Sequence, residues 1–322
     1  MNKEKITPFI GLFFGILSVS TASIFIRFAQ NQAPSIVIAA FRLSIASLLI
    51  APFAYFHYKK QLFNITKKEL TFLILSGFFL AIHFAAWITS LETTSIASSV
   101  VLVTTTPLWV ALLSPLFLKE KNNTTIWVGL ILAFLGSSLV AFSHQCSFSV
   151  DKIIACNIAG FWFDKNSLLG NSLALIGAWM AAGYLMVGRK VRSTIPVLKY
   201  IFFVYTFSAI FLLIMVFFTG QTMIGYSGQT YLWMILLGLI PQLLGHSIFN
   251  WALGHLPAAF VSIALIGEPI GTIILAFLFL KEVPNFLEIL GGLLILGGIF
   301  LVSFFQPKKY LRKDINLQKI EG

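Results

Sequence analysis

The chain has 322 residues, of which 58% are hydrophobic and 10% are charged, and its mean hydropathy is +0.92. A soluble globular protein carries about 25% charged residues, so this composition excludes a soluble fold and predicts a protein embedded in a membrane. The net charge of +11 is explained by basic loops that fix the orientation of the chain. Because no soluble segment carries a basic stripe with interleaved aromatic residues, nucleic-acid binding is not expected.

A helix that crosses a bilayer needs about 20 mostly apolar residues, and ten runs of this kind occur. In chain order they cover 9–26, 34–56, 70–90, 95–118, 125–143, 168–188, 197–219, 230–252, 257–280 and 286–305. The first run follows Lys3 and Lys5 and is similar to a signal peptide. It is nevertheless long enough to span and further spans follow, so it is predicted to be an uncleaved transmembrane helix.

Lys and Arg residues in the loops predict the orientation. With a cytoplasmic N-terminus, 17 of the 22 basic residues lie in cytoplasmic segments. Four lie outside, namely Arg27, Lys152, Lys165 and Lys281, and Arg42 lies within a span. This bias predicts a multi-pass protein of the cell (inner) membrane with both termini in the cytoplasm.

The two halves of the chain carry an internal repeat. The sequence Leu-Phe-Leu-Lys-Glu at 116–120 recurs at 278–282, so the numbering of the two copies differs by 162, which we call the repeat register. The same register pairs Ala97 with Ala259, Leu91 with Leu253, Pro107 with Pro269, Gly129 with Gly291 and Gly136 with Gly298. Five helices is an odd number, so the second copy enters the membrane in the opposite orientation.

These patterns predict an all-α polytopic membrane protein with ten transmembrane helices arranged as two inverted five-helix repeats. The first repeat is expected to cover 1–143 and the second 168–305. An extracytoplasmic linker, 144–167, joins them, and a basic cytoplasmic tail, 306–322, follows. In transporters with inverted repeats the substrate site lies near the midplane between the repeats.

Glu268 is the acid that lies deepest in any predicted span. An ionised side chain there costs about 3 kcal/mol on insertion scales, so it should face the bundle interior or a cavity. Pro269 interrupts the helix directly after it. Glu268 is predicted to couple a proton or bind a substrate amine; the alternative is a neutral acid that is hydrogen-bonded between helices.

The repeat register pairs Glu268 with Thr106, which follows Thr104 and Thr105. The three hydroxyls are predicted to approach the same midplane region; the alternative is that each bonds back to the preceding turn of its own helix. Arg42, in the second span, has a planar guanidinium that suits a carboxylate or phosphate. Its alternative role is structural, capping carbonyls or pairing with an acid such as Glu268.

Further polar and aromatic residues in the spans are candidates for a cavity lining. Gln242, His246 and Asn250 lie one turn apart and share one face of the eighth span. Lipid does not tolerate such a face, so they are predicted to point inward, either lining a cavity or bonding between helices. The remaining candidates are His83 and Trp87 in the third span, and Trp179 and Tyr184 in the sixth.

The chain contains two cysteines, Cys146 and Cys156, in the linker. They form no CxxC or metal-type spacing, and no His or Cys cluster or glycine-rich phosphate loop occurs, so no cofactor and no metal is expected. Under the predicted topology both cysteines face an oxidising compartment, and they are either disulfide-bonded or free.

The chain resembles the ten-helix EamA type of the drug/metabolite transporter superfamily over roughly 10–142 and 170–304. The resemblance is carried by 38–42 (Ile-Ala-Ala-Phe-Arg), by Thr106-Pro107-Leu108 running to Leu118-Lys119-Glu120, by Glu268-Pro269 running to Leu280-Lys281-Glu282, and by Gly-Arg-Lys at 188–190. It implies a transporter that moves amino acids, other small metabolites or drugs, mostly outward.

The sequence therefore predicts an exporter of amino acids or related zwitterionic or cationic solutes, working as a monomer or homodimer in the lipid bilayer, with proton coupling as one option. A phosphorylated or nucleotide-type substrate is the alternative, but it calls for several intramembrane cations, and only Arg42 qualifies. An integral membrane enzyme is the rival class. It is not expected, because loop acids are sparse and no nucleophile–base pair or metal-ligand set is visible.

Overall fold

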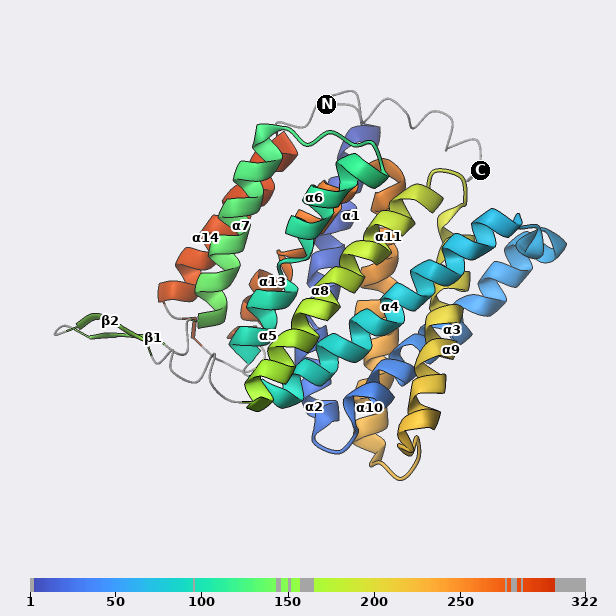
Figure 1. Cartoon of the computed structure of the whole chain (residues 1–322), viewed down its shortest axis with the longest axis horizontal. Helices are drawn as coiled ribbons and strands as arrows, with labels where there is room; N and C mark the ends of the chain where they lie inside the picture. The colour runs from blue at the N-terminus through green and yellow to red at the C-terminus, as the bar shows by residue number, and fades with distance from the viewer. Residues whose placement is uncertain are drawn as a thin grey trace.

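The computed structural model describes residues 3–94, 96–142, 146–149, 152–156, 165–275, 277–278, 283–284 and 286–304. Figure 1 shows a bundle of helices with a small β-hairpin projecting from one side. The helices of the first half are α1 (Lys3–Val19), α2 (Ala22–Gln30), α3 (Ser35–Tyr58), the 3-10 helix η1 (Lys59–Phe63), α4 (Lys67–Thr93), α5 (Ile96–Val103), α6 (Thr106–Phe117) and α7 (Thr124–Phe142). Those of the second half are α8 (Lys165–Val191), α9 (Val197–Thr219), α10 (Gly228–Leu237), the π-helical η2 (Gly238–His246), α11 (Ser247–His255), α12 (Ala258–Leu265), α13 (Glu268–Leu275) and α14 (Phe286–Phe304).

The helix boundaries follow the repeat register. When the first half is shifted by this register, the bounds of α5 become those of α12, and the bounds of α7 become those of α14. The first residues of α1, α3 and α6 likewise shift onto those of α8, α9 and α13. The register that the sequence predicted is therefore confirmed by the secondary structure along both halves.

Each of the ten predicted spans is mostly helical in its described part, and the ten-helix fold is confirmed. Within the described residues, eight helices are long and apolar enough to cross a membrane, and two shorter apolar helices, Thr124–Val140 and Phe286–Val302, complete the set. Large apolar side chains on the outside of the bundle are strongly exposed, as a lipid-facing surface requires; examples are Leu48, Leu116, Phe217 and Phe218.

Local sequence explains where several helices begin. Pro34 and Pro196, which the repeat register again relates, precede α3 and α9, where a proline costs no intrahelical hydrogen bond. Thr66 and Glu69 form a capping box at the start of α4. Three spans are interrupted by short turns, at 20–21, 104–105 and 266–267, and the eighth changes from α to π geometry in η2, which contains Pro241.

The contact between α7 and α14 shows the two-fold relation of the repeats directly. A Cβ atom added at Gly291 would lie 2.5 Å from the Gly136 carbonyl oxygen, and one added at Gly298 would lie 2.5 Å from that of Gly129. The repeat register relates Gly129 to Gly291 and Gly136 to Gly298. The contact between Gly129 and Gly298 is therefore the repeat equivalent of the contact between Gly291 and Gly136. This reciprocal pattern is that of an isologous interface, and it requires antiparallel helices, as an inverted repeat provides.

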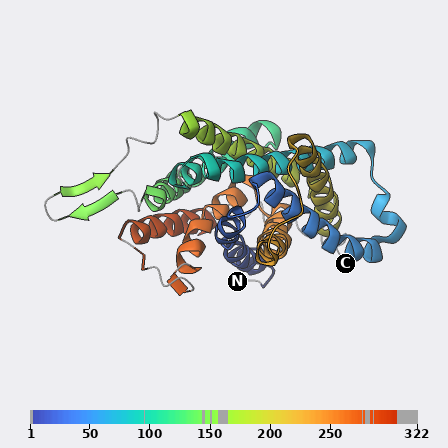
Figure 2. The same ribbon diagram turned by 90° about the horizontal axis from the view of Figure 1, so that it is seen from below.

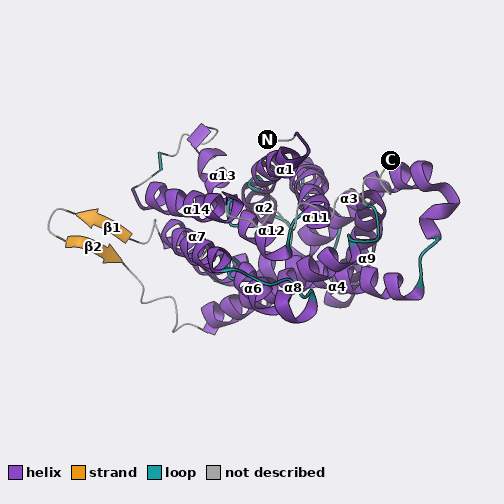
Figure 3. Cartoon of the chain, turned by 90° about the horizontal axis from the view of Figure 1, so that it is seen from above, coloured by secondary structure: helices purple, strands orange, loops and turns teal. Residues whose placement is uncertain are grey.

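Other helix pairs follow the same symmetry (Figure 3). The α4 helix packs on α8, and its counterpart, the span formed by α10, η2 and α11, packs on α1. The α3 helix packs on its own counterpart, α9. The centre of the bundle is therefore built from contacts between repeats.

The linker departs from the all-helical prediction. It contains strands β1 (Cys146–Ser149) and β2 (Lys152–Cys156), which pair antiparallel and lie apart from the bundle (Figure 2). Cys146 is the register partner of Cys156. Residues directly opposite in antiparallel strands have Cα atoms about 4.5–5.5 Å apart, a spacing that suits a disulfide. The disulfide remains a prediction.

Candidate functional site

A cavity of about 780 Å³, including the part open to solvent, lies between the two repeats. Its walls come from the first to fourth spans of the first repeat and from the sixth, eighth and ninth spans of the second. The lining residues are Val19, Ala22, Arg42, His83, Phe84, Trp87, Val103, Thr104, Thr106, Pro107, Ala181, Tyr184, Leu185, His246, Phe249, Ser262, Leu265, Ile266 and Glu268.

The lining itself obeys the repeat register. Most of the lining residues form pairs in which one member is the register counterpart of the other. The pairs are Val19 with Ala181, Ala22 with Tyr184, Phe84 with His246, Trp87 with Phe249, Val103 with Leu265, Thr104 with Ile266 and Thr106 with Glu268. A cavity that is lined by both members of so many pairs lies on the pseudo-two-fold axis, where the prediction placed the site.

The fourth and ninth spans break at this axis. The α5 helix ends at Val103 and α6 begins at Thr106; α12 ends at Leu265 and α13 begins at Glu268. Both breaks precede a proline, which cannot donate the next backbone hydrogen bond. The interruption predicted at Pro269 is present, the first repeat has the equivalent break, and both open onto the cavity.

The threonines at the first break bond back to their own helix. Thr104, Thr105 and Thr106 each donate to the carbonyl three residues earlier, with oxygen–oxygen distances of 3.0, 2.6 and 2.8 Å. These bonds satisfy carbonyls that the break releases. Thr104 and Thr106 line the cavity, whereas Thr105 does not: its hydroxyl accepts a hydrogen bond from the Trp109 indole.

Glu268 begins α13 and lines the cavity from the second break. Its backbone carbonyl accepts hydrogen bonds from the Ser20 hydroxyl at 2.9 Å and the Thr272 hydroxyl at 3.1 Å. Ser20 lies at the turn between α1 and α2, so the interrupted first span holds the backbone of the interrupted ninth. No hydrogen bond or salt bridge joins the Glu268 carboxylate to another residue of the described chain. Among the described residues, the carboxylate therefore has none of the interhelical hydrogen bonds that its alternative role would require.

Arg42 is 1% exposed and lines the same cavity. Its Nε donates to Gln242 Oε1 at 2.8 Å, and its guanidinium lies 4.0 Å from the centre of the Phe84 ring. Its Nη1 is buried and has no hydrogen-bond partner within the described chain. A buried donor without an acceptor is costly, so this atom is suited to a ligand that brings one.

His83 and Trp87 both line the cavity and stack on each other, with ring centres 5.9 Å apart. His83 Nδ1 lies 2.9 Å from the Gly177 carbonyl oxygen, which orients the imidazole toward α8. The Trp87 indole nitrogen is buried, and no described residue accepts a hydrogen bond from it. The cavity therefore contains a second donor without a partner.

The three polar residues of the eighth span all turn inward, but only His246 lines the cavity. Gln242 holds Arg42, and Asn250 Oδ1 accepts a hydrogen bond from the Tyr184 hydroxyl at 2.7 Å. Gln242 and Asn250 therefore stand one layer behind the cavity wall and orient Arg42 and Tyr184, which form it.

Trp179 lies outside the cavity. It is 42% exposed and meets Trp109 edge to face, with ring centres 5.4 Å apart. It belongs to the outer surface of the bundle, since its side chain lies on the face of α8 away from the residues that line the cavity. Its prediction as a cavity residue is corrected accordingly.

Several lining residues were not predicted, among them Phe84, Phe249 and Ser262. The signal that finds two of them is the repeat register itself. The register counterparts of His246 and Trp87 are Phe84 and Phe249, which look like ordinary apolar residues of a span. His83 and His246 are not equivalent positions, as the sequence indicated, because the counterpart of His246 is Phe84.

Among the described residues, no group of three or more His, Cys, Asp or Glu side chains could hold a metal ion. The cavity wall combines one acid, one guanidinium, two imidazoles, four hydroxyl groups and several aromatic rings with apolar side chains.

Ten helices in two inverted repeats, with a cavity where interrupted helices meet on the repeat axis, are the architecture of a membrane transporter. The chain belongs to the EamA-like transporter family, whose model matches residues 7–142 and 168–304.

Curated relatives support the same class. An uncharacterized transporter of Bacillus subtilis, YdfC, is 25% identical over 264 residues, covering 81% of this chain and 79% of the relative. Solute carrier family 35 member G1 of Mus musculus is 26% identical over 297 residues, covering 91% and 77%. An S-adenosylmethionine uptake transporter of Rickettsia felis is 25% identical over 153 residues, covering 46% and 51%.

A solved structure titled "Crystal structure of protein" is similar with a TM-score of 0.73, covering 92% of this chain and 96% of its own, at 16% identity. At that identity the likeness speaks for the fold alone. The relatives named above are transporters, which agrees with the expectation that the chain is not an enzyme.

Proposed function

We propose that the chain moves small zwitterionic or cationic metabolites, such as amino acids, across the cell membrane by alternating access. One observation carries the proposal: an unpaired carboxylate, that of Glu268, and unpaired donors on Arg42 and Trp87 line one cavity on the repeat axis. Each of these groups lacks a partner within the described chain, and a substrate with one amine and one carboxylate would satisfy them together.

The two charges come from opposite repeats. Arg42 belongs to the first repeat and its register counterpart is Val204; Glu268 belongs to the second and its counterpart is Thr106. The cavity therefore carries its two charges on opposite sides, although its walls are built from positions that the repeat register relates. An α-amino acid has the matching polarity, with its carboxylate at Arg42 and its ammonium at Glu268, and a guanidinium suits a carboxylate geometrically.

A phosphate ester fits this cavity less well. Its double negative charge would meet a single guanidinium and a carboxylate in the same enclosed space. Burying a charge without a partner costs several kcal/mol, so a site for phosphate needs more than one cation.

The named substrate of one relative belongs to the proposed class. S-adenosylmethionine, the substrate in the name of the Rickettsia felis transporter, carries an α-amino-acid group and a cationic sulfonium. That protein is named for uptake, whereas we propose export for this chain, on the resemblance of its sequence to a mostly outward-moving family. Loop charge supports a topology with both termini in the cytoplasm.

Glu268 is also the group through which we propose proton coupling. A carboxylate with no partner in the described chain, in a largely apolar cavity, can hold either a proton or a substrate ammonium, but not both. Competition between these two cations at one site would couple the movement of one to the movement of the other.

Counterflow in proteoliposomes tests the proposal. Proteoliposomes that hold the purified chain are loaded with one unlabelled solute from a panel of amino acids, polyamines, nucleosides and sugar phosphates. Uptake of the same solute in labelled form is then measured with and without a pH gradient. We expect zwitterionic or cationic solutes to drive counterflow. Exchange of phosphorylated solutes alone would contradict the proposed substrate class, and no counterflow by any solute would contradict transport.

Glu268→Gln tests the acid in the same assay. The amide keeps the shape but neither ionises nor pairs with an ammonium, so counterflow should fall at least about tenfold and lose its pH dependence. Glu69→Gln is the matched control: Glu69 is an acid in the capping box of α4, outside the cavity, and Gln can still accept its hydrogen bonds. A well-inserted Glu268→Gln variant that still transports in a pH-dependent manner would refute the role of this acid.

A further inference from the structure

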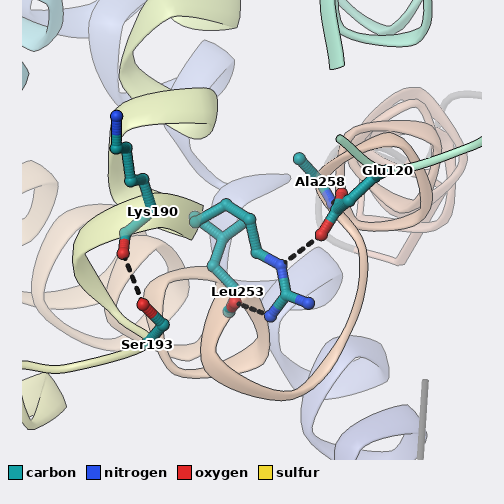
Figure 4. Close-up of polar contacts among 6 residues, drawn as sticks. Glu120, Lys190, Ser193, Leu253 and Ala258 are labelled. Atoms are coloured by element: carbon teal, nitrogen blue, oxygen red, sulfur yellow. Dashed lines mark hydrogen bonds and ion pairs between the residues drawn. The ribbon is translucent and has the colours of Figure 1, made fainter. Parts of the chain in front are cut away.

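One ion pair and the hydrogen bonds around it join the two repeats at one end of the bundle (Figure 4). Glu120, in the loop after α6, accepts a hydrogen bond from Arg189 Nε at 2.6 Å and one from the backbone N–H of Ala258 at 3.1 Å. Arg189 Nη1 also donates to the Leu253 carbonyl at 2.7 Å. We call Glu120, Arg189, Leu253 and Ala258 the clasp. It ties the first repeat to the sixth, eighth and ninth spans.

The loop that delivers Glu120 is itself held in place. Lys119 has a φ of 56°, in the left-handed region that non-glycine residues rarely adopt, and this turns the chain sharply after α6. The Asn122 amide then donates back to the Ala111 carbonyl and the Ser114 hydroxyl on α6. The repeat counterpart of Asn122 is Pro284, which has no side-chain amide. Position 284 therefore cannot make the bonds with which Asn122 secures the clasp.

The repeat register gives each clasp position a counterpart at the opposite end of the bundle. Arg189 corresponds to Arg27, in the last turn of α2; Leu253 corresponds to Leu91, and Ala258 to Ile96. Glu120 corresponds to Glu282, which lies outside the described residues. Figure 1 shows α2 at the bottom of the bundle and the end of α6 at the top.

The two equivalent arginines are in different states. Arg189 is engaged with a side-chain exposure of 18%, whereas Arg27 is exposed and forms no hydrogen bond or ion pair with any other described residue. In alternating access, one gate is open while the other is closed. A state in which Arg189 is bound and the equivalent Arg27 is unbound fits this requirement.

We propose that the clasp is the closed gate of one membrane face, and that Arg27 is the gate arginine of the opposite face, which engages only when the clasp opens. This rests on the proposed function, since gates matter only to a transporter. The assignment gives a role in the transport cycle to three charged residues that do not line the cavity: Glu120, Arg189 and Arg27.

Labelling of a cavity cysteine from each membrane face tests the gates without knowledge of the substrate. Thr104→Cys is placed in the full chain with Cys146 and Cys156 changed to serine, and an impermeant maleimide is applied to vesicles of either orientation. Glu120→Gln should raise the labelling rate from the clasp face at least about fivefold relative to the opposite face. Arg27→Gln should shift the ratio in the other direction.

The double variant and the controls make the outcome decisive. Glu120→Gln with Arg27→Gln should return the labelling ratio toward that of the parent, since both gates are weakened. Arg189→Lys, which keeps the charge but loses the forked contact, should give an intermediate shift. Lys190→Gln should give none, because the Lys190 ammonium lies over the Phe72 ring and is not part of the clasp.

Shifts of the same sign for Glu120→Gln and Arg27→Gln would overturn the proposal, as would unchanged ratios or an equal shift for Lys190→Gln. A merely structural clasp would lower thermal stability without opposing changes in labelling. Because the readout is accessibility, gating can succeed while counterflow fails for every solute tested, so the failure of each proposal is recognisable separately.

Discussion

The two repeats share a scaffold and differ in chemistry. The first residues of five pairs of helices coincide after a shift by the repeat register, and the fifth helices of the two repeats meet through reciprocal glycines. At several pairs on the cavity wall, however, the polarity differs: Glu268 is paired with Thr106, and Trp87, whose indole carries an N–H, is paired with Phe249. Symmetry is kept where helices must pack and abandoned where a ligand would bind.

This division has a physical reason. Alternating access needs two similar gates, and duplicated packing provides them at little cost. A symmetric cavity, in contrast, would present the same groups in two opposite directions and could not orient a zwitterion. Substitutions can therefore separate the two roles. Those that make the cavity residues of one repeat like those of the other should destroy substrate binding and leave the scaffold intact. Those at the reciprocal glycines should destroy the scaffold.

The largest effect is expected at the glycine contact. Gly291→Ala would place a Cβ against the backbone of α7, which cannot move as a side chain can. Overpacking of this kind costs up to about 3 kcal/mol, or roughly 6–12 °C in unfolding temperature. Gly292→Ala is the matched control one residue along the same helix, because a Cβ there meets no atom within 4 Å. Thermal unfolding in detergent compares them, and equal melting of the two variants would contradict the reciprocal packing.

The next effect concerns the acid. The double variant Thr106→Glu with Glu268→Thr moves the carboxylate to the other repeat while keeping the composition of the cavity. Arg42 has no charged counterpart, so the two charges no longer lie on opposite sides of the axis, and counterflow should fall about 100-fold, since a misplaced intramembrane charge costs about 3 kcal/mol. Retention of most activity by a well-inserted double variant would show that the side on which the acid lies does not matter.

The sequence predicted the helical scaffold more completely than the residues that line the cavity. Helix number and register followed from apolar run lengths and from identical residues such as Pro107 and Pro269, which are local signals. The polar candidates were found because polar groups in a span are rare. The sequence could not tell which of them line the cavity and which lie behind its wall. Gln242 and Asn250 share a helix face with His246, and only packing decides which of the three reaches the cavity. Phe84 and Phe249 escaped notice because an apolar residue in a span carries no local signal.

A smaller effect is expected from Gln242→Leu, which gives the eighth span the residue that the third has at Leu80. The change removes the acceptor of Arg42 Nε, while the Gln242 amide nitrogen loses nothing because it has no partner within the described chain. Arg42 should then be less well oriented, and KM for a carboxylate substrate should rise roughly tenfold with a smaller change in kcat, since a hydrogen bond to a charged group contributes about 1.5–3 kcal/mol.

The control for Gln242→Leu is a second substrate that lacks a carboxylate. A polyamine has no carboxylate and would not use Arg42, so its KM should stay within about twofold of the parent value. A parallel rise in KM for both solutes would point to general distortion of η2 instead of a lost position for the guanidinium.

The smallest effect is expected from Trp87→Phe, which gives the third span the residue that the eighth has at Phe249. The ring that stacks on His83 is kept, and the change removes chiefly the indole N–H, which has no acceptor among the described residues. If that N–H binds a substrate oxygen, the loss of one neutral hydrogen bond, about 1 kcal/mol, should raise KM roughly fivefold for amino acids and leave polyamines unchanged. Equal kinetics of parent and variant for both solutes would assign Trp87 to packing, and the carboxylate would then be bound by Arg42 without it.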